Sequence, residues 1–196
     1  MTTFKQKSDV RLAVFLATGF EEIEAISVVD VAFRAGMLCD MVSVTDERQV
    51  TSSRNVTVVT DKCITDDDFD FDAYDMLVLP GGIPGMPNLE ACQPLCDALV
   101  DFNARGKGVA AICASPSILA KLGILDGRAA TGNPHFQDVL AQNGATVLAN
   151  TRTVTDGNVI TSQGMATACD FGLAIVEHFL GQVAADKVKE GIVLLD

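Results

Sequence analysis

The fold is decided by residues 108–117, which read GVAAICASPS. The first half of this stretch is small and apolar, which is typical of a fully buried strand. Ser115 favours the N-cap of a helix and Pro116 suits its first turn, so the pattern predicts a helix that ends at Gly123. Cys113 is therefore predicted at a sharp strand-to-helix junction. This is the geometry of a nucleophile elbow, with cysteine in place of serine.

The predicted position of Cys113 favours a reactive thiol. The thiol would face the start of the following helix, where unpaired N–H groups and about half a positive charge gather. A thiolate is stabilised there, so the pKa of Cys113 is expected to fall below its free value of about 8.5. The alternative is a structural cysteine, because free cysteines are commonly buried and pack as small hydrophobes. The elbow and a second glycine-rich turn, Gly81-Gly82, favour the catalytic interpretation.

The rest of the chain alternates strands with helices. Apolar runs predict strands, and helical periodicity closed by glycine predicts helices. Strands are expected at 10–17, 37–44, 56–60, 75–80, 109–112, 128–131, 146–148 and 159–162, the last after a hairpin turn at Asp156-Gly157, and helices at 21–36, 88–106, 135–142, 164–181 and 183–189. This order predicts an α/β fold, with a mostly parallel sheet, helices on both faces and one domain over residues 1–196.

Three residues are expected to meet at one edge of that sheet. Glu24, Gly82 and Cys113 each follow the end of a predicted strand. Binding sites in parallel sheets form beyond the carboxyl ends of the strands. The glycine turn would let backbone N–H groups approach a ligand closely there. The acidic run 66–72, DDDFDFD, lacks the glycine and glutamate of a calcium loop and is interpreted as a solvated connection.

The composition limits the possible partners. Of the 196 residues 48% are hydrophobic, and the formal net charge of −12 argues against nucleic acid. No apolar run reaches the ~18 residues of a membrane span, and the polar start, 1–9, lacks the apolar core of a signal peptide, so a cytoplasmic location is expected. The six cysteines are expected to be reduced. Cys92 and Cys96 have helical spacing but lack the further ligands that zinc needs.

Three motifs in order resemble the ThiJ/PfpI superfamily, in its DJ-one-like branch and closest to the bacterial members. They are GFEEIE at 19–24, LPGG at 79–82 and AAICA at 110–114. The likeness extends to TSQG at 161–164 and FGLAIVE at 171–177, and so covers nearly the whole chain. The resemblance implies a flavodoxin-like sandwich, a homodimer, and chemistry that requires no cofactor and no metal. An apolar patch along the helix from Glu22 to Arg34 is the candidate interface.

The resemblance also implies a role for each site residue. Cys113 would be the nucleophile, and Glu24 a protonated carboxyl that donates a hydrogen bond to the thiolate. Physical chemistry supports this, because a carboxyl desolvated beside an anion has a raised pKa and stays neutral. The backbone N–H groups of Gly82 and Ala114 would be the oxyanion donors, and Gly81 is a further candidate for orienting a substrate.

Two positions differ from relatives that use a histidine. Ala114 stands where PfpI-type proteases carry a histidine directly after the cysteine, so no protease triad is encoded locally. Asn133 stands where many DJ-one-like proteins carry a histidine, and an amide can orient a substrate but cannot shuttle a proton. His135 is a candidate substitute for that role, and the alternative is a surface residue near a helix start.

These residues favour an enzyme that acts on small reactive carbonyls. The leading hypothesis is a cysteine-dependent glyoxalase or protein deglycase, of hydro-lyase or hydrolase type, acting on methylglyoxal, glyoxal or their protein adducts. The alternative is a redox-responsive stress protein or chaperone, because the same thiolate would oxidise to sulfenic and sulfinic acid. A cysteine peptidase or amidase is the weaker alternative, since it needs a histidine close to Cys113.

Overall fold

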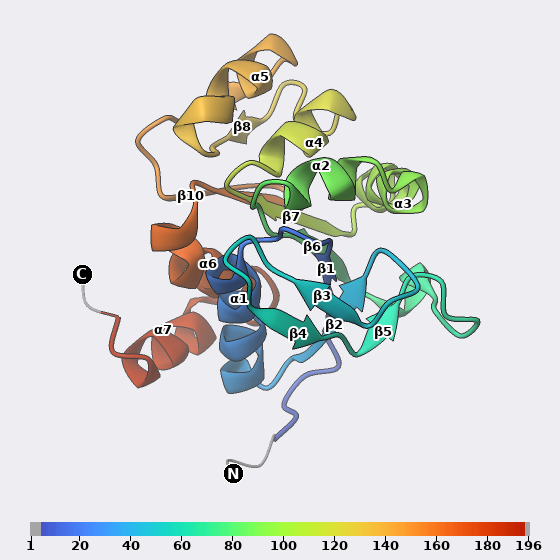
Figure 1. The fold of residues 1–196 in the computed structure, drawn as a ribbon. Helices are drawn as coiled ribbons and strands as arrows, with labels where there is room; N and C mark the ends of the chain where they lie inside the picture. The colour runs from blue at the N-terminus through green and yellow to red at the C-terminus, as the bar shows by residue number, and fades with distance from the viewer. Residues whose placement is uncertain (1–4, 195–196) are drawn as a thin grey trace.

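The computed structural model describes residues 5–194, and its centre is a seven-stranded sheet (Figure 1). The strand order is β10-β11-β7-β6-β1-β2-β5, and every neighbouring pair is parallel except β10 and β11. The bounds are Arg11–Leu16 for β1, Leu38–Ser43 for β2, Lys62–Cys63 for β5, Met76–Leu79 for β6, Gly108–Ile112 for β7, Thr153–Asp156 for β10 and Val159–Ser162 for β11. The predicted mostly parallel sheet is confirmed.

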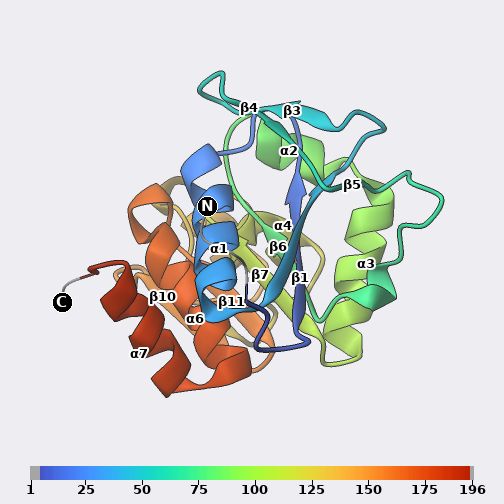
Figure 2. The same ribbon diagram turned by 90° about the horizontal axis from the view of Figure 1, so that it is seen from below.

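Helices cover both faces of this sheet (Figure 2). On one face lie α1 (Glu22–Ala35), α6 (Ala168–Leu180) and α7 (Gln182–Gly191), and on the other lie α2 (Gly85–Glu90), α3 (Gln93–Ala104), α4 (Pro116–Lys121) and α5 (Gln137–Gln142). The strands alternate their side chains between two apolar cores. In β1, Leu12, Val14 and Leu16 pack toward α1 and α6, while Ala13 and Phe15 pack toward α3 and α4.

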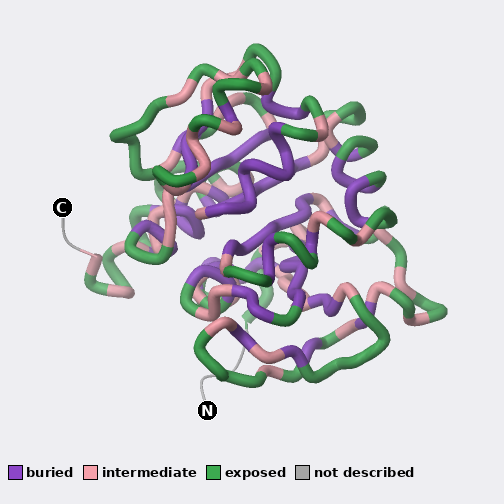
Figure 3. The backbone as a smooth tube through the Cα atoms, turned by 45° about the horizontal axis from the view of Figure 1, so that its top comes forward, coloured by how far each residue is buried: buried purple, intermediate pink, exposed green. Residues whose placement is uncertain are grey.

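The central strands are fully buried, as their apolar sequences predict (Figure 3). Every residue of β6 and of β7 is buried. Strands covered on both faces lose the alternation of apolar and polar residues, because neither face meets water. The loops that follow the carboxyl ends of β1, β6 and β7 therefore begin at a closely packed part of the sheet.

Two small sheets lie outside the main one. β3 (Gln49–Thr51) and β4 (Thr57–Val59) form an antiparallel hairpin, so the predicted segment 56–60 is a hairpin arm. β8 (Ala129–Ala130) pairs with β9 (Thr146–Val147) in a parallel ladder instead of joining the main sheet. The hairpin predicted around Asp156-Gly157 is confirmed as β10–β11.

Two sequence-based details are wrong. The predicted helix 88–106 is two helices, interrupted at Ala91 and Cys92, because Pro94 in the first turn of α3 has no N–H to continue the hydrogen bonds of α2. The Asn88 amide donates to the carbonyl of Thr18 and holds α2 against the turn after β1 (2.9 Å). Ser115 stands at the N-cap of α4 but has helical backbone angles and makes no side-chain cap. Its hydroxyl donates instead to the carbonyl of Pro80 (2.6 Å).

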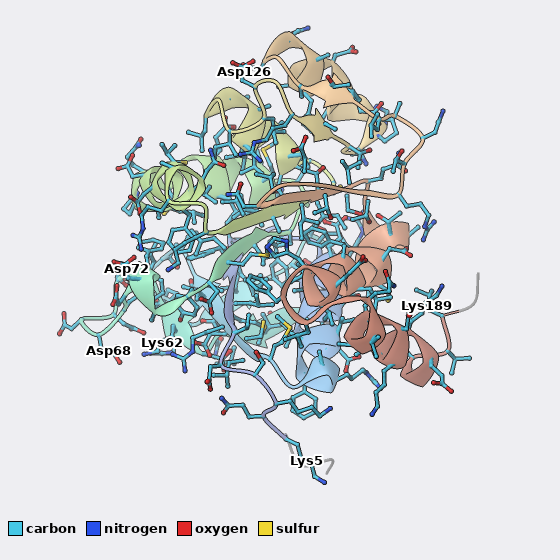
Figure 4. All side chains as sticks on the ribbon, turned by 180° about the vertical axis from the view of Figure 1, so that it is seen from behind. Lys5, Lys62, Asp68, Asp72, Asp126 and Lys189 are labelled. Carbon is cyan, nitrogen blue, oxygen red and sulfur yellow. The ribbon has the colours of Figure 1, made fainter. Side chains whose placement is uncertain are left out.

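The acidic run 66–72 is more than a solvated connection. Asp66 pairs with Arg48, Asp68 with Lys62, and Asp72 with Arg105. The labelled Lys62, Asp68 and Asp72 lie together at one side of the molecule (Figure 4). Between the aspartates, the rings of Phe69 and Phe71 pack on Phe15, with centroids 6.3 and 5.9 Å from it, and Phe71–Ala73 forms a short 3-10 turn, η1. The two aromatic rings therefore anchor this segment to the core.

Across residues 5–194, no helix combines the length and apolar character needed to cross a bilayer. The same residues contain no group of three or more histidine, cysteine or acidic side chains arranged to hold a metal ion.

Candidate active site

Cys113 occupies the predicted elbow between β7 and α4. Its φ angle is +66°, in the left-handed region that side chains seldom adopt. Its backbone is held on both sides, because its N–H donates to the carbonyl of Ser162 (3.0 Å) and its carbonyl accepts from the N–H of Asn133 (2.8 Å). The hydrogen bond from Ser115 to Pro80 then fastens the elbow to the glycine turn after β6. The thiol is thus presented at the edge of the sheet.

Glu24 reaches the same point from the first turn of α1. Its side chain is buried, with 1% of its surface exposed. The Glu21 carboxylate caps α1 by accepting the N–H of Glu24 (2.7 Å), which fixes where the helix begins. The Oε2 atom of Glu24 accepts the N–H of Gly81 (2.7 Å), and the carboxyl is also hydrogen-bonded to Cys113. Its Oε1 atom is buried without a hydrogen-bond partner.

The glycine turn allows the thiol and the carboxyl to come this close. A β-carbon on Gly81 would lie 2.6 Å from the Cβ of Cys113 and 2.9 Å from Oε2 of Glu24, so only glycine fits there. Gly82 has a φ of +99°, and its N–H and that of Ala114 both hydrogen-bond to the Cys113 sulfur. The predicted convergence of Glu24, Gly82 and Cys113 is therefore confirmed as geometry.

Burial changes the proton affinity of the carboxyl. The pKa of Glu24 is raised from 4.5 to about 7, chiefly because the buried carboxyl is desolvated, while the Gly81 hydrogen bond opposes the shift. A carboxyl with this pKa exchanges protons readily at neutral pH, as a general acid or base requires.

The expected low pKa of Cys113 is wrong. Burial raises the pKa of this thiol to about 12, and the charge of Glu24 and the hydrogen bond to it add to the shift. Only the N–H groups of Ala114 and Gly82 act in the opposite direction. α4 has just six residues, and its end cannot outweigh a carboxylate in contact with the sulfur. Because the pKa of Cys113 lies well above that of Glu24, the pair loses its protons in two separate steps and retains one proton after the first.

Two further residues, Asn133 and Gly164, lie beside the Cys113 sulfur. The amide of Asn133 directs Nδ2 toward the Cys113 sulfur (3.7 Å), and its Oδ1 accepts the N–H of His135 (3.1 Å). Gly164, which sequence reasoning did not single out, faces the sulfur from the loop after β11, within the TSQG motif. His135 itself is exposed in the short 3-10 turn η2 (Pro134–Phe136). Among the described residues, no hydrogen bond joins the His135 imidazole to Cys113 or Glu24.

Comparison with known proteins agrees with this geometry. The model of the DJ-1/PfpI family matches residues 10–178. The chain belongs to the DJ-1/PfpI family. It is 36% identical over 186 residues to the Parkinson disease protein 7 homolog of Danio rerio, covering 95% of this chain and 98% of that protein. The solved structure of oxidised DJ-1 from Toxoplasma gondii superposes with a TM-score of 0.85 at 33% identity, covering 94% of this chain and 98% of that one.

Another DJ-1/PfpI relative carries an activity in its name. The glutathione-independent glyoxalase DJR-1.2 of Caenorhabditis elegans is 31% identical over 174 residues, covering 89% of this chain and 90% of that protein. The structural likeness confirms the flavodoxin-like fold implied by the sequence motifs. The DJ-1/PfpI family of this chain thus includes a protein named as a glyoxalase.

Proposed function

We propose that the protein is a cysteine-dependent glyoxalase that converts methylglyoxal and glyoxal to hydroxy acids without a cofactor. The observation that carries the proposal is the contact between the buried Glu24 carboxyl and the Cys113 thiol, beside the N–H groups of Gly82 and Ala114. When the thiol proton resides on Glu24, the sulfur is a thiolate held by the N–H groups of Gly82 and Ala114. A nucleophile and a proton donor are then paired at one carbonyl carbon.

The reaction balances without an external oxidant. The thiolate adds to the aldehyde carbon, and the carbonyl oxygen takes the Glu24 proton, which forms a hemithioacetal. The Glu24 carboxylate then removes the hydrogen of that carbon as a proton and returns it to the neighbouring ketone carbon, while the hydroxyl proton of the hemithioacetal passes to the ketone oxygen. The first carbon is thereby oxidised to a thioester while the second is reduced to an alcohol. Water cleaves the thioester, releases the hydroxy acid and restores the Cys113 thiol.

The same steps apply to a carbonyl already attached to a protein. The nematode relative named as a glyoxalase supports the free dicarbonyl as substrate. A glycated side chain presents a hemiaminal carbon, from which the amine would leave with the Glu24 proton as the sulfur bonds to that carbon, which gives the same hemithioacetal. Cys113 is partly exposed at the edge of the sheet, where a protein side chain could reach it. Deglycase activity is therefore proposed as an extension of the glyoxalase reaction.

Lactate formation from methylglyoxal tests the proposed function. We expect wild-type protein to form lactate catalytically, and we expect Cys113→Ala and Glu24→Gln to lose at least 100-fold in rate, the low end for a missing acid or base. Product must be followed, because the five other thiols can bind the aldehyde without turnover. Cys63→Ser is the matched control, since this buried thiol lies on β5. A folded wild type that forms no lactate would contradict the proposal.

A redox role is the second candidate. Cys113 is partly exposed and faces several hydrogen-bond donors, which would also stabilise the oxygens of a sulfinate. The oxidised state of the Toxoplasma gondii DJ-1 structure supports this reading. Selective gain of two oxygens at Cys113 after mild peroxide, in a protein that forms no lactate, would favour a sensor over an enzyme.

The peptidase alternative has little support, because His135 is exposed and Asn133 faces the thiol.

We further propose that the chain, 1–196, forms one domain that acts as a homodimer in the cytoplasm. Ile23, Ile26 and Phe33 of α1 expose 49, 38 and 39% of their surfaces. Ile23 and Ile26 line a hollow of about 380 Å³ together with Ile192 and Val193. Exposed apolar side chains gathered in this way favour association with a second copy.

A further inference from the structure

The backbone of Gly164 faces the Cys113 sulfur, the Glu24 carboxyl and the Asn133 amide. A β-carbon built on Gly164 would lie 3.8 Å from Oε1 of Glu24, 3.9 Å from Nδ2 of Asn133 and 3.9 Å from Sγ of Cys113. One point therefore faces the nucleophile, the carboxyl and the amide together. The Glu24 oxygen that faces it is the buried atom without a hydrogen-bond partner. A bound substrate oxygen would supply that partner.

Gly164 and Gly81 are glycines for different reasons. A β-carbon on Gly81 would overlap the Cys113 side chain, so that glycine permits close packing. The contacts of a β-carbon on Gly164 are ordinary van der Waals distances, so one carbon fits between this backbone and the three site groups without a clash. Its φ of 160° is extended backbone that any residue adopts. Glycine at 164 is thus required neither by local conformation nor by packing.

The backbone at Gly164 is also held in place. Its N–H donates to the hydroxyl of Thr167 (3.1 Å), and its carbonyl accepts both the N–H (2.7 Å) and the hydroxyl (2.8 Å) of Thr167. The Thr167 hydroxyl is joined to Ser162 at the end of β11 (2.7 Å). A side chain added at 164 would therefore extend into the space over the sulfur instead of moving the loop.

We propose that Gly164 determines the size of the electrophile that Cys113 accepts. The inference rests on the proposed glyoxalase function where that electrophile is a 2-oxoaldehyde. The aldehyde oxygen would then meet Oε1 of Glu24, the second carbonyl would meet Nδ2 of Asn133, and the substituent would lie against Gly164. The open backbone admits the methyl group of methylglyoxal beside the reacting carbon, and a methyl side chain at 164 would compete for that volume.

The test compares Gly164→Ala with Gly191→Ala, a glycine on α7 with open space around it. We expect Gly164→Ala to lower kcat/KM for methylglyoxal at least tenfold more than kcat/KM for the smaller glyoxal, the effect of one carbon in a close-fitting site. We expect Gly191→Ala to leave the ratio of the two values unchanged. A general structural defect would lower both substrates alike, and thermal unfolding of each variant identifies such a defect.

A second measurement does not depend on turnover. We expect Gly164→Ala to slow the alkylation of Cys113 by iodoacetamide about tenfold, followed by peptide mass spectrometry at that residue. If the wild type forms no hydroxy acid, the glyoxalase proposal fails and the alkylation rate alone decides the inference. Equal alkylation rates in the wild type and Gly164→Ala, or an unchanged ratio of the two dicarbonyls, would overturn the role of Gly164.

Discussion

The proton shared by Glu24 and Cys113 makes the reactivity of the sulfur depend on pH. Below about pH 7 both groups are protonated, and above it the Glu24 carboxylate can accept the thiol proton, so a fixed minor fraction of the pair carries a thiolate. We predict that the rate of Cys113 alkylation rises about tenfold per pH unit up to pH 7 and then levels off. Iodoacetamide labelling between pH 5 and 9, read at Cys113, measures this profile.

Two variants test whether Glu24 is the group that causes the inflection near pH 7. Glu24→Gln should lose the inflection near pH 7, because the amide cannot titrate. Glu177→Gln, which changes an exposed carboxylate on α6, should keep it. The same inflection in Glu24→Gln would show that another group controls the thiol.

The raised pKa of Glu24 also carries a stability cost that grows with pH. A carboxyl whose folded pKa exceeds its unfolded value favours folding most at low pH and loses that contribution as pH rises through the folded pKa. For a rise from 4.5 to about 7, we predict that the free energy of unfolding falls by roughly 3 kcal/mol between those values. Urea unfolding of wild type and Glu24→Gln at pH 4.5 and 8 measures it. The free energy of unfolding should fall more between these two pH values in the wild type than in Glu24→Gln. An equal fall in the two proteins would refute the prediction.

At the scale of the elements, a hydrogen bond holds the elbow at Cys113 against the turn that follows β6. Ser115 is fully buried, and its hydroxyl joins α4 to the carbonyl at the end of β6. We predict that Ser115→Ala lowers the free energy of unfolding by about 1–3 kcal/mol, since it leaves the Pro80 carbonyl buried without this partner. Thr65→Ala, at an exposed position, is the control. Chemical denaturation gives the values, and a Ser115→Ala loss no larger than the control would contradict this role.

Other elements owe their position to side chains far away in the chain. The Asn88 amide of α2 donates to the carbonyl of Thr18, seventy residues earlier, and holds the helix against the turn after β1. Phe69 and Phe71 hold an acidic segment on the core that the charge pattern alone describes as solvated. At the acidic segment, the local pattern favours exposure and the tertiary contact of the two rings selects attachment to the core.

At the scale of the whole molecule, the exposed apolar face of α1 provides the surface for a second copy. We predict that the wild type sediments as a dimer and that Ile26→Glu sediments as a monomer, because a desolvated charge is costly in an apolar interface. Val100→Glu is the matched control, since Val100 is a similarly exposed apolar residue on α3, across the sheet. Sedimentation velocity distinguishes the species. A monomeric wild type, or a dimeric Ile26→Glu protein, would refute this interface.

The sequence by itself determined the sheet, the order of most elements and the elbow at Cys113. These features follow from short-range rules: buried apolar runs make strands, glycine ends helices, and a turn between strand and helix presents its residue at the edge of a sheet. The same rules placed Glu24 and Gly82 beside Cys113, since parallel strands end at a common edge.

Only the tertiary structure decided the chemistry at that edge. The direction of the Cys113 pKa depends on burial and on contact with a carboxyl 89 positions earlier in the chain, neither of which a local pattern contains. The partner of Ser115 and the place of Gly164 are likewise set by strands distant in sequence. Desolvation and long-range contact are properties of the packed molecule, so the reactive state of the site becomes defined only when the sheet brings these segments together.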